Sequence, residues 1–239
     1  MSDPTVLSAT GLFKSFHKDR IEVPVLRGLD LEVTPGVVTA LVGRSGSGKS
    51  TLMHLLASLD QPDSGEIYFA GERIDNASRA RRDEYRNRDI GIIFQFYHLL
   101  PELSAVENVL APLMIGRTAW NYFRHRKAAR TYAEAMLDRV GLLHRAKHRP
   151  AEMSGGEMQR AAIARALMTS PKLLLADEPT GNLDTETGQE ILKLLTELNE
   201  VDGLTILMIT HDDSIAAGAD VCHRMQDGQL QASKQLRAA

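Results

Sequence analysis

The sequence predicts an α/β fold, and three observations lead to this prediction. Short apolar segments alternate with helical segments along most of the chain. Each apolar segment is bounded by polar residues, as the central strands of a parallel sheet are. From about Ser104 to Leu143 the pattern becomes helical and strand signals vanish, so residues 96 to about 165 are expected to form a helical insertion in the α/β core.

The elements follow one another in a simple order. Strands are expected at 5–12, 23–33, 37–42, 65–70, 90–94, 172–176 and 204–209. A helix is expected from Lys49 to about Leu59, where the polar, proline-containing stretch 60–63 ends it, and another at 185–200.

Composition excludes several classes of protein. The 239 residues carry 28 Lys or Arg and 31 Asp or Glu, and 43% hydrophobic residues with 25% charged ones are typical of one large globular domain, alone or with a subdomain. The single cysteine, Cys222, excludes an internal disulfide and a multi-cysteine metal site. No apolar run reaches the ~18 residues of a membrane helix, and no secretory signal opens the chain. These features predict a soluble, cytoplasmic protein, and the net charge of −3 gives no support for nucleic-acid binding.

A phosphate-binding loop is predicted between the strand at 37–42 and the helix that follows. Its pattern, G-x-x-x-x-G-K-[ST], is the Walker A pattern and has the required strand before it and helix after it. The residues are Gly43, Arg44, Ser45, Gly46, Ser47, Gly48, Lys49, Ser50 and Thr51. Glycines let backbone N–H groups converge on phosphate oxygens, Lys49 would reach the β- and γ-phosphates, and Ser50 would bind Mg²⁺. Nucleotide binding is therefore expected.

Two carboxylates, Asp177 and Glu178, end the apolar segment at 172–176. At the carboxyl end of a parallel strand they would face the crevice where ligands bind. Asp177 is then expected to hold the Mg²⁺ shell, and Glu178 to accept a proton from the attacking water. Alone, the pattern fits an ordinary strand and polar turn somewhat better, since Pro179 and Gly181 mark a turn. The phosphate loop earlier in the chain favours the acidic site.

The segment Met153-Ser-Gly-Gly-Glu-Met-Gln-Arg160 resembles the LSGGQ-type signature of ATP-binding cassette (ABC) ATPases, with Met153 where leucine is usual. Ser154 is a good helix N-cap, so this segment is expected to open a helix whose positive end can face a phosphate. The rest of the family's set is present in order. It comprises the aromatic Phe16, the Q-loop Gln95, the D-loop 181–184 and the switch His211. The resemblance spans about 5–231.

The resemblance implies a fold, a set of roles and a mode of assembly. The implied fold is a P-loop NTPase (RecA-like) core with a mainly parallel sheet, an N-terminal antiparallel β subdomain and an inserted helical subdomain. The whole is one domain over 5–231, with the core at 5–95 and 166–231 and the helical part at 96–165. The implied catalytic residues are Glu178, His211, Gln95 and Lys49. The implied metal ligands are Ser50, Gln95 and Asp177, and Phe16 would stack on adenine. Ser154, Gly155 and Gly156 would complete the site around ATP of a second copy, in a head-to-tail homodimer, and Asp184 of the D-loop would also belong to the nucleotide site.

The stretches 92–113 and PTGNLD after Glu178 resemble the ATPases of lipoprotein-releasing, macrolide-exporting and cell-division systems. The lipoprotein-releasing ATPases are the nearest, because the sequence has no fused membrane region near its end. Such a subunit would hydrolyse ATP at the cytoplasmic face of the inner membrane and power a separate permease. Export, cell-envelope remodelling, and a soluble non-transport or regulatory cassette remain as alternatives. Intact Glu178 and His211 argue for hydrolysis.

Two surface features complete the sequence-based predictions. Tyr97, Leu99 and Leu100 follow the Q-loop glutamine and are expected to help form the dock for a permease helix. Residues 117–149 carry nine Lys or Arg against Glu134 and Asp138. This region is either a solvated basic helix or a face near anionic lipid head groups, and the sequence favours neither.

Overall fold

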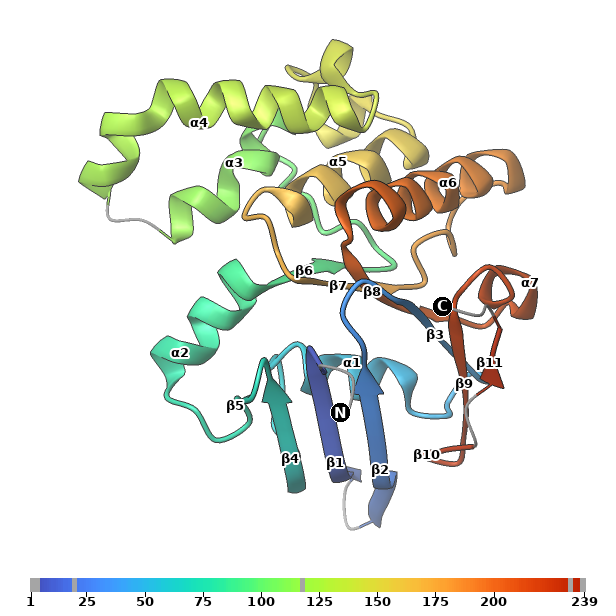
Figure 1. Cartoon of the computed structure of the whole chain (residues 1–239). Coiled ribbons are helices and arrows are strands. Elements are labelled where there is room, and N and C mark those ends of the chain that lie inside the picture. The colour runs from blue at the N-terminus through green and yellow to red at the C-terminus, as the bar shows by residue number, and fades with distance from the viewer. Residues whose placement is uncertain (1–4, 19–20, 117–118, 232–233, 237–239) are drawn as a thin grey trace.

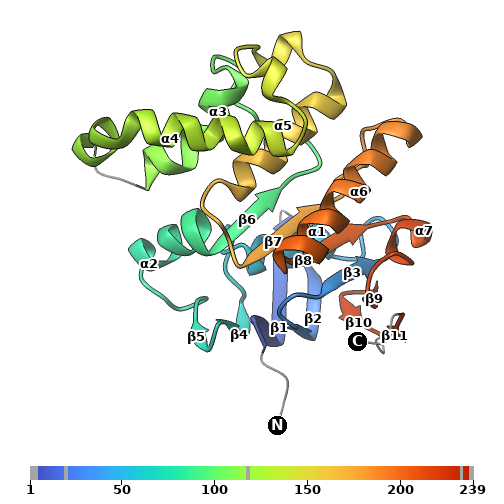
Figure 2. The ribbon, with the colours of Figure 1, turned by 45° about the horizontal axis from the view of Figure 1, so that its top comes forward.

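The computed structural model describes residues 5–18, 21–116, 119–231 and 234–236. It has three levels, as Figure 1 shows: a helical layer above, a mixed sheet in the middle and an antiparallel sheet below. The turned view in Figure 2 keeps the same order, with α3, α4 and α5 above the central sheet. The predicted α/β class is confirmed.

The antiparallel sheet has the strand order β2-β1-β4-β5. Its strands are β1 (Leu7–Lys18), β2 (Ile21–Val33), β4 (Ser64–Phe69) and β5 (Glu72–Arg73). β1 lies between β2 and β4 and pairs with both of them in antiparallel fashion. The sequence predicts shorter first strands, because the polar residues of 13–18 hide the continuation of β1.

The central sheet has the order β10-β9-β3-β8-β7-β6, and β11 pairs with β9. Its strands are β3 (Val38–Val42), β6 (Ile90–Ile93), β7 (Leu173–Asp177), β8 (Thr205–Thr210), β9 (Val221–Gln226), β10 (Gln229–Leu230) and β11 (Lys234–Gln235). The five strands from β9 to β6 run parallel, so their carboxyl ends meet along one edge.

Helices and helical turns connect the strands of the two sheets and form the layer above them. They are α1 (Lys49–Leu56), α2 (Arg79–Glu84), a π-helical turn (Tyr85–Asp89), α3 (Ala105–Ile115), α4 (Ala119–Arg139), two 3₁₀ turns (Leu143–Arg145 and Pro150–Glu152), α5 (Gly155–Leu167), α6 (Thr185–Asp202) and α7 (Asp213–Ala216). The predicted helical region 104–143 is confirmed by α3 and α4. The first turn of α3 is fixed by the capping box of Ser104 and Glu107.

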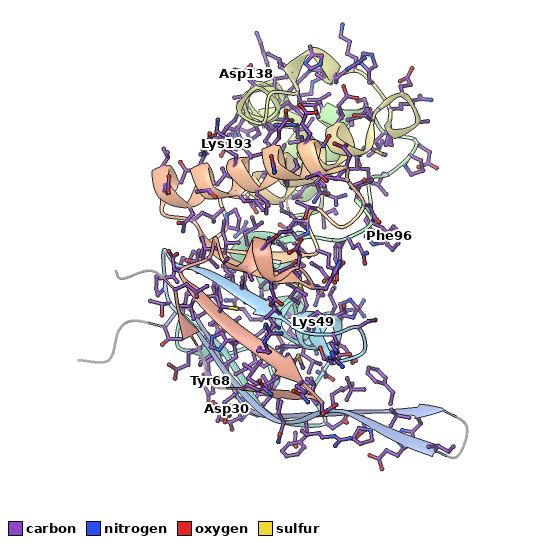
Figure 3. The ribbon with its side chains drawn as sticks, turned by 90° about the vertical axis from the view of Figure 1, so that its right-hand side faces the viewer. Asp30, Lys49, Tyr68, Phe96, Asp138 and Lys193 are labelled. Carbon is purple, nitrogen blue, oxygen red and sulfur yellow. The ribbon has the colours of Figure 1, made fainter. Side chains whose placement is uncertain are left out.

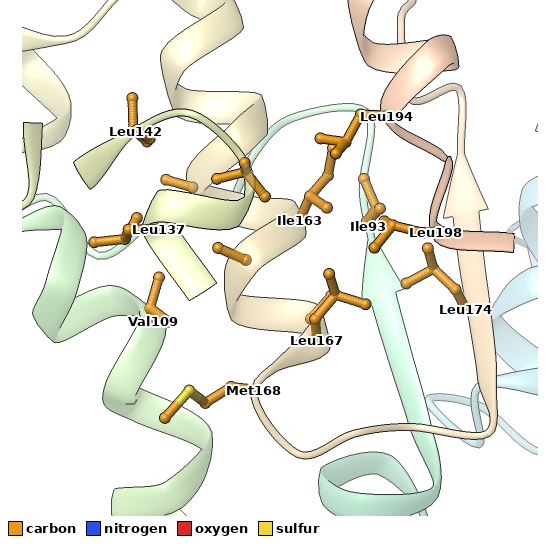
Figure 4. Close-up of a cluster of buried hydrophobic side chains, with 14 of the residues drawn as sticks. Ile93, Val109, Leu137, Leu142, Ile163, Leu167, Met168, Leu174, Leu194 and Leu198 are labelled. Atoms are coloured by element: carbon orange, nitrogen blue, oxygen red, sulfur yellow. The ribbon is translucent and has the colours of Figure 1, made fainter. Parts of the chain in front are cut away.

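Two apolar cores hold the levels together. One lies between the helical layer and the central sheet, and Figure 4 shows part of it: Val109, Leu137 and Ile163 face Ile93 and Leu174. The other surrounds α1, which is packed between the two sheets. Met153 is 8% exposed and belongs to the first core, so its side chain is an apolar core contact, as leucine would be.

Two elements of the structure, β9 and α2, are not predicted from the sequence, and part of one predicted region lies outside the residues that the structure describes. β9 and α2 have no apolar periodicity, and they form because tertiary partners complete them. The predicted basic region begins at Arg117, which lies outside the described residues. Within the described part of the chain, no helix combines the length and the apolar character needed to cross a membrane.

Candidate functional site

The phosphate-binding loop joins β3 to α1 and is supported from behind by the last strands. Gly48 is the N-cap of α1 with φ 104°, and a Cβ there would meet Cε of Met225 at 2.9 Å and the Val25 carbonyl at 3.1 Å. A Cβ on Gly43 would collide with the carbonyl of Met225. The Gly228 N–H donates to the Ser47 carbonyl at 3.2 Å. Only glycine fits these positions.

Lys49 lies at the base of this loop, at the start of α1 (Figure 3), and is 7% exposed. Its ammonium donates to the carbonyls of Gly43 at 2.8 Å and Arg44 at 3.0 Å. The hydroxyl of Ser47 is buried with no hydrogen-bond partner among the described residues. A buried cation and an unpaired hydroxyl at the N-terminus of a helix are suited to anionic oxygens.

A pocket of about 630 Å³ opens over the loop. It is lined by Phe16, Val25, Ser45, Gly46, Gly48, Lys49, Ser50, Thr51, Gln95, Glu178 and His211. Ten of these eleven residues are among those that the sequence predicts for the nucleotide site, and they come from segments up to 195 positions apart (211 − 16). The structure therefore brings together the loop, the Q-loop glutamine, the acidic strand end and the switch histidine.

Val25 is the lining residue that the sequence analysis misses. Lys14 of β1 pairs with Leu26 and Ser15 pairs with Pro24, which leaves Val25 as an extra residue in β2. Such a β-bulge turns a side chain out of its strand and is common beside functional sites. The usable sequence signal is Pro24, because a proline inside a strand marks an edge or a bulge.

Phe16 forms one wall of the pocket and is 44% exposed. Its register partner on β2 is Val23, which is also 44% exposed. The ammonium of Lys14 lies 5.4 Å from the centre of the Phe16 ring. An exposed ring with one face toward a pocket suits the stacking that the sequence predicts for it.

Glu178 directly follows β7 and has a left-handed backbone, with φ 45°. Its N–H donates to the Ile209 carbonyl at 2.9 Å, and its own carbonyl accepts from Gly181 at 3.0 Å. A Cβ on Gly181 would lie 3.0 Å from Oε2 of Glu178. The strained backbone is held on both sides, which fixes where the carboxylate points.

Asp177 ends β7 one residue earlier and lies beside the loop. Burial raises the pKa of its carboxyl, and the neighbouring charge of Glu178 raises it further. A hydrogen bond with Ser50 and the charge of Lys49 act in the opposite direction. The carboxylate thus lies against Ser50 at a place where negative charge is poorly compensated.

The signature residues Ser154, Gly155 and Gly156 do not line the pocket of their own chain. Ser154 is the N-cap of α5 and forms a capping box with Glu157, which confirms the predicted helix start. A Cβ on Gly155 would lie 2.9 Å from the Tyr97 hydroxyl, and one on Gly156 would collide with Cγ2 of Thr187. These glycines are therefore also needed for packing within the chain.

Asp184 lies in a second cleft of about 450 Å³, which shares Glu178 and His211 with the first pocket. Its carboxylate accepts from the Thr187 N–H at 3.0 Å and so caps α6. This hydrogen bond lowers the pKa of Asp184. Asp184 is thus ionised and rigidly held beside the site, without lining the pocket over the loop.

The loop after Gln95 is tied down by side chains from two other segments. Asn182 donates to the Gln95 carbonyl at 2.8 Å. Arg165 of α5 donates to the carbonyls of Tyr97 at 2.9 Å and His98 at 2.5 Å. Phe96 points away from the body of the protein (Figure 3) and is 66% exposed.

A third pocket, of about 330 Å³, lies behind this loop. Its lining includes Phe94, His98, Leu100, Pro112, Ile115 and Arg165. Of the three residues predicted for the dock, Leu100 lines this pocket and is 48% exposed. Tyr97 does not line it, and Leu99 packs against the helical core, so the part of these two residues in the dock stays a prediction.

Comparisons with known proteins agree with this geometry. The family model described as ABC transporter matches residues 26–181. The chain is 71% identical over 230 residues to the lipoprotein-releasing system ATP-binding protein LolD 2 of Rhodopirellula baltica, covering 96% of this chain and 90% of that protein. It is 48% identical to the LolD protein of Acinetobacter baylyi, covering 93% of this chain and 96% of that protein.

Solved structures of the same kind superpose closely. The ATP-binding cassette MJ0796, in a dimeric post-hydrolysis state bound to ADP and Pi, matches with a TM-score of 0.86 and 32% identity, covering 98% of this chain and all of that one. The protein cbiO1 from Clostridium perfringens, part of the ABC transporter complex cbiONQ, matches with a TM-score of 0.82 and 30% identity, covering 98% of this chain and 90% of that one.

Proposed function

The chain belongs to the ABC transporter family of ATP-binding proteins, and from this premise we propose that it is the ATP-hydrolysing subunit of a lipoprotein-releasing system. The observation that carries the proposal is the 630 Å³ pocket, in which Lys49, Glu178 and His211 meet. The residue proposed to bind phosphate and the residues proposed to hydrolyse ATP thus line the same cavity. The relatives with 71% and 48% identity carry the lipoprotein-releasing name.

ATP would enter this pocket with its phosphates over the loop. The N–H groups at the start of α1 and the buried ammonium of Lys49 would hold the phosphate oxygens. Phe16 would stack on the adenine ring, with Val25 beside it. Glu178 would accept a proton from the water that attacks the terminal phosphate, and His211 and Gln95 would orient the reacting groups. Each of these side chains lines the same pocket.

Mg²⁺ fits the residues proposed to hold it, namely Ser50, Gln95 and Asp177. Hydroxyl, amide and carboxylate oxygens are the donors that this ion prefers. The raised pKa of half-buried Asp177 indicates a carboxylate that a divalent cation would stabilise. Among the described residues no three His, Cys, Asp or Glu side chains form a metal-binding group, as expected for an ion that takes part of its shell from substrate phosphates. When bound, Mg²⁺ supplies charge neutralisation for the β- and γ-phosphates.

A second copy of the chain would complete the site. The signature residues Ser154, Gly155 and Gly156 lie at the positive end of α5, outside their own pocket. Two copies arranged head to tail would each present this helix end, with Asp184 nearby, to ATP held by the other. The dimeric MJ0796 structures support this arrangement.

ATP hydrolysis by this subunit would drive a separate permease, which the subunit contacts at the cytoplasmic face of the inner membrane. The 330 Å³ pocket behind Gln95 would receive a helix of that partner, and Leu100 and Ile115 offer it apolar contacts. The subunit would then be attached to the membrane peripherally. We also propose the division into a core (5–95 and 166–231) and a helical part (96–165) within one domain.

Reconstitution tests the proposal. The chain and its permease are placed in vesicles that hold a lipoprotein, and its ATP-dependent release is measured, with Glu178→Gln as the inactive control. Release that needs ATP and intact Glu178 supports the proposal. Stimulated ATP hydrolysis without lipoprotein release would refute this substrate, and movement of a macrolide instead would favour an exporter.

A further inference from the structure

Gln159 joins the signature helix to the residue that follows Glu178. It lies in the second turn of α5, and its side chain is 1% exposed. Its amide Nε2 donates to the Pro179 carbonyl at 2.6 Å. Its Oε1 is buried with no hydrogen-bond partner in the described chain. A buried amide that leaves its own oxygen unpaired is costly, so stability alone does not explain a glutamine at this position.

Pro179 is the neighbour on which the position of Glu178 depends. The strained backbone of Glu178 is fixed before it by the N–H bond to Ile209 and after it by the bond from Gly181. The Gln159 amide fixes the peptide between these two points. A shift of the Pro179 carbonyl would therefore rotate the Glu178 carboxylate and the contact of its Oε1 with His211.

The Gln159 side chain also comes from a helix, α5, that is tightly packed on both sides of this residue. Gly156, one turn before Gln159, is packed against Thr187 of α6, and the following residues 161–164 are fully buried. α5 contributes Arg165 to the carbonyls of Tyr97 and His98 in the Q-loop as well. One helix thus carries two polar side chains that hold backbone carbonyls, one after Glu178 and two after Gln95.

We propose that Gln159 is a positioning residue for ATP hydrolysis, which holds the Pro179 carbonyl and thereby sets the Glu178 carboxylate for its contact with water. The inference rests on the proposed function, because it assumes that Glu178 is the general base. Gln159 is 1% exposed and does not line the pocket over the loop, so it offers almost no surface to a nucleotide bound by either copy. Its replacement is therefore expected to lower kcat and to leave the Kd for ATP unchanged.

The experiment compares two replacements of similar size with a matched control. Gln159→Met removes the donor and also the unpaired oxygen, so the fold is kept. Gln159→Glu has the same shape but donates to Pro179 only when protonated, and burial raises the pKa of such a carboxyl. Gln61→Met is the control, because exposed Gln61 also donates to a backbone carbonyl, that of Asp75, away from α5.

Gln159→Met is expected to lower kcat about 10- to 100-fold, the loss that a small misplacement of a catalytic group causes, with the Kd for ATP unchanged. In Gln159→Glu, the ratio of its kcat to that of the unchanged protein should rise as the pH falls, because the protonated carboxyl restores the donor. Gln61→Met should match the unchanged protein in both quantities.

Three results would overturn the inference: an unchanged kcat in Gln159→Met, a loss confined to ATP binding or thermal stability, or a pH-independent ratio in Gln159→Glu. Failure of the proposed function is distinguishable, because Glu178→Gln would then keep its turnover. If Glu178→Gln is inactive and Gln159→Met is fully active, only the positioning role is wrong.

Discussion

The Nδ1 atom of His211 lies 3.0 Å from Oε1 of Glu178. The two residues come from the ends of neighbouring parallel strands, β8 and β7, so the sheet itself sets their separation. The Glu178 side chain is 19% exposed and that of His211 is 63% exposed. The half-buried carboxylate lines the pocket over the phosphate loop, where a water above the loop would approach it.

Replacing Glu178 by glutamine should stop turnover while ATP still binds. The amide keeps the shape of the side chain and cannot accept the proton, and losses of general-base function run roughly 10²–10⁴-fold in kcat. Phosphate release and nucleotide binding are measured on the same sample. Turnover near the unchanged level would remove Glu178 from this role.

Replacing Lys49 by alanine should instead weaken ATP binding. Its buried ammonium is placed to face phosphate charge that is present before any reaction, and a hydrogen bond of this kind contributes about 1.5–3 kcal/mol, or roughly 10- to 150-fold in Kd. Titration calorimetry gives the Kd. Lys193→Ala is the control, since Lys193 on α6 is exposed. Equal affinities in the two variants would contradict the prediction.

Asp177→Asn should stabilise the nucleotide-free protein and impair magnesium-dependent ATP binding. Burial raises the pKa of Asp177 in the folded state, so the folded protein holds its proton more tightly than the unfolded chain does. The stability contributed by the protonated form is complete below the unfolded pKa and is lost as the pH rises through the folded pKa.

The asparagine removes this loss, so its free energy of unfolding should exceed that of the unchanged protein at neutral pH, and the gain should shrink in acid. Urea unfolding at both pH values measures the difference. Asp138→Asn, at an exposed position of α4, should show no such gain. A less stable Asp177→Asn at neutral pH is the contrary outcome.

Assembly should follow nucleotide binding. If Ser154 and Gly156 complete the partner's site, ATP binds the dimer more tightly and must drive association by linkage. Glu178→Gln with ATP should therefore scatter light as a dimer at micromolar concentration, and the ATP-free sample largely as a monomer. A monomer at saturating ATP would count against a shared site in the isolated chain.

A charge placed in the pocket behind the Q-loop should separate the subunit from its permease. Leu100→Glu would bury an unpaired charge against a docked helix and weaken association by a few kcal/mol, while ATP binding is spared. Val201→Glu is the matched control, because Val201 is 79% exposed on α6 and does not line this pocket. Co-purification is measured for both. Full recovery of the permease with Leu100→Glu would place the dock elsewhere.

Local sequence was enough to predict the phosphate loop, because strand, glycine turn and helix are consecutive between residues 37 and 56. It was also enough for the start of α5, where Ser154 and Glu157 cap a helix through neighbours three positions apart. In both cases the physical cause of the structure lies within a few residues. The same applies to β7 and β8, whose apolar runs need burial on both faces.

Other features depend on partners far along the chain. The role of Gln159 depends on its hydrogen bond to Pro179, 20 residues later in the chain. The place of Val25 in the pocket depends on a shift of register between β1 and β2. β9 carries Cys222, His223 and Arg224 in its middle, so no apolar alternation announces it, and pairing with β3 makes it a strand. Tyr97 and Leu99 do not line the pocket behind the Q-loop, because the local sequence does not say which side of the loop is covered.

The support of the phosphate loop by the last strands has a consequence for the order in which the protein is made. Residues 43–51 leave the ribosome early, yet the wall that shapes them is built from Met225 and Gly228, about 180 residues later. During synthesis the nascent chain carries the complete loop sequence without its fitted conformation. Tight nucleotide binding is therefore expected only when β9 and the turn after it have emerged, so incomplete chains would not sequester ATP.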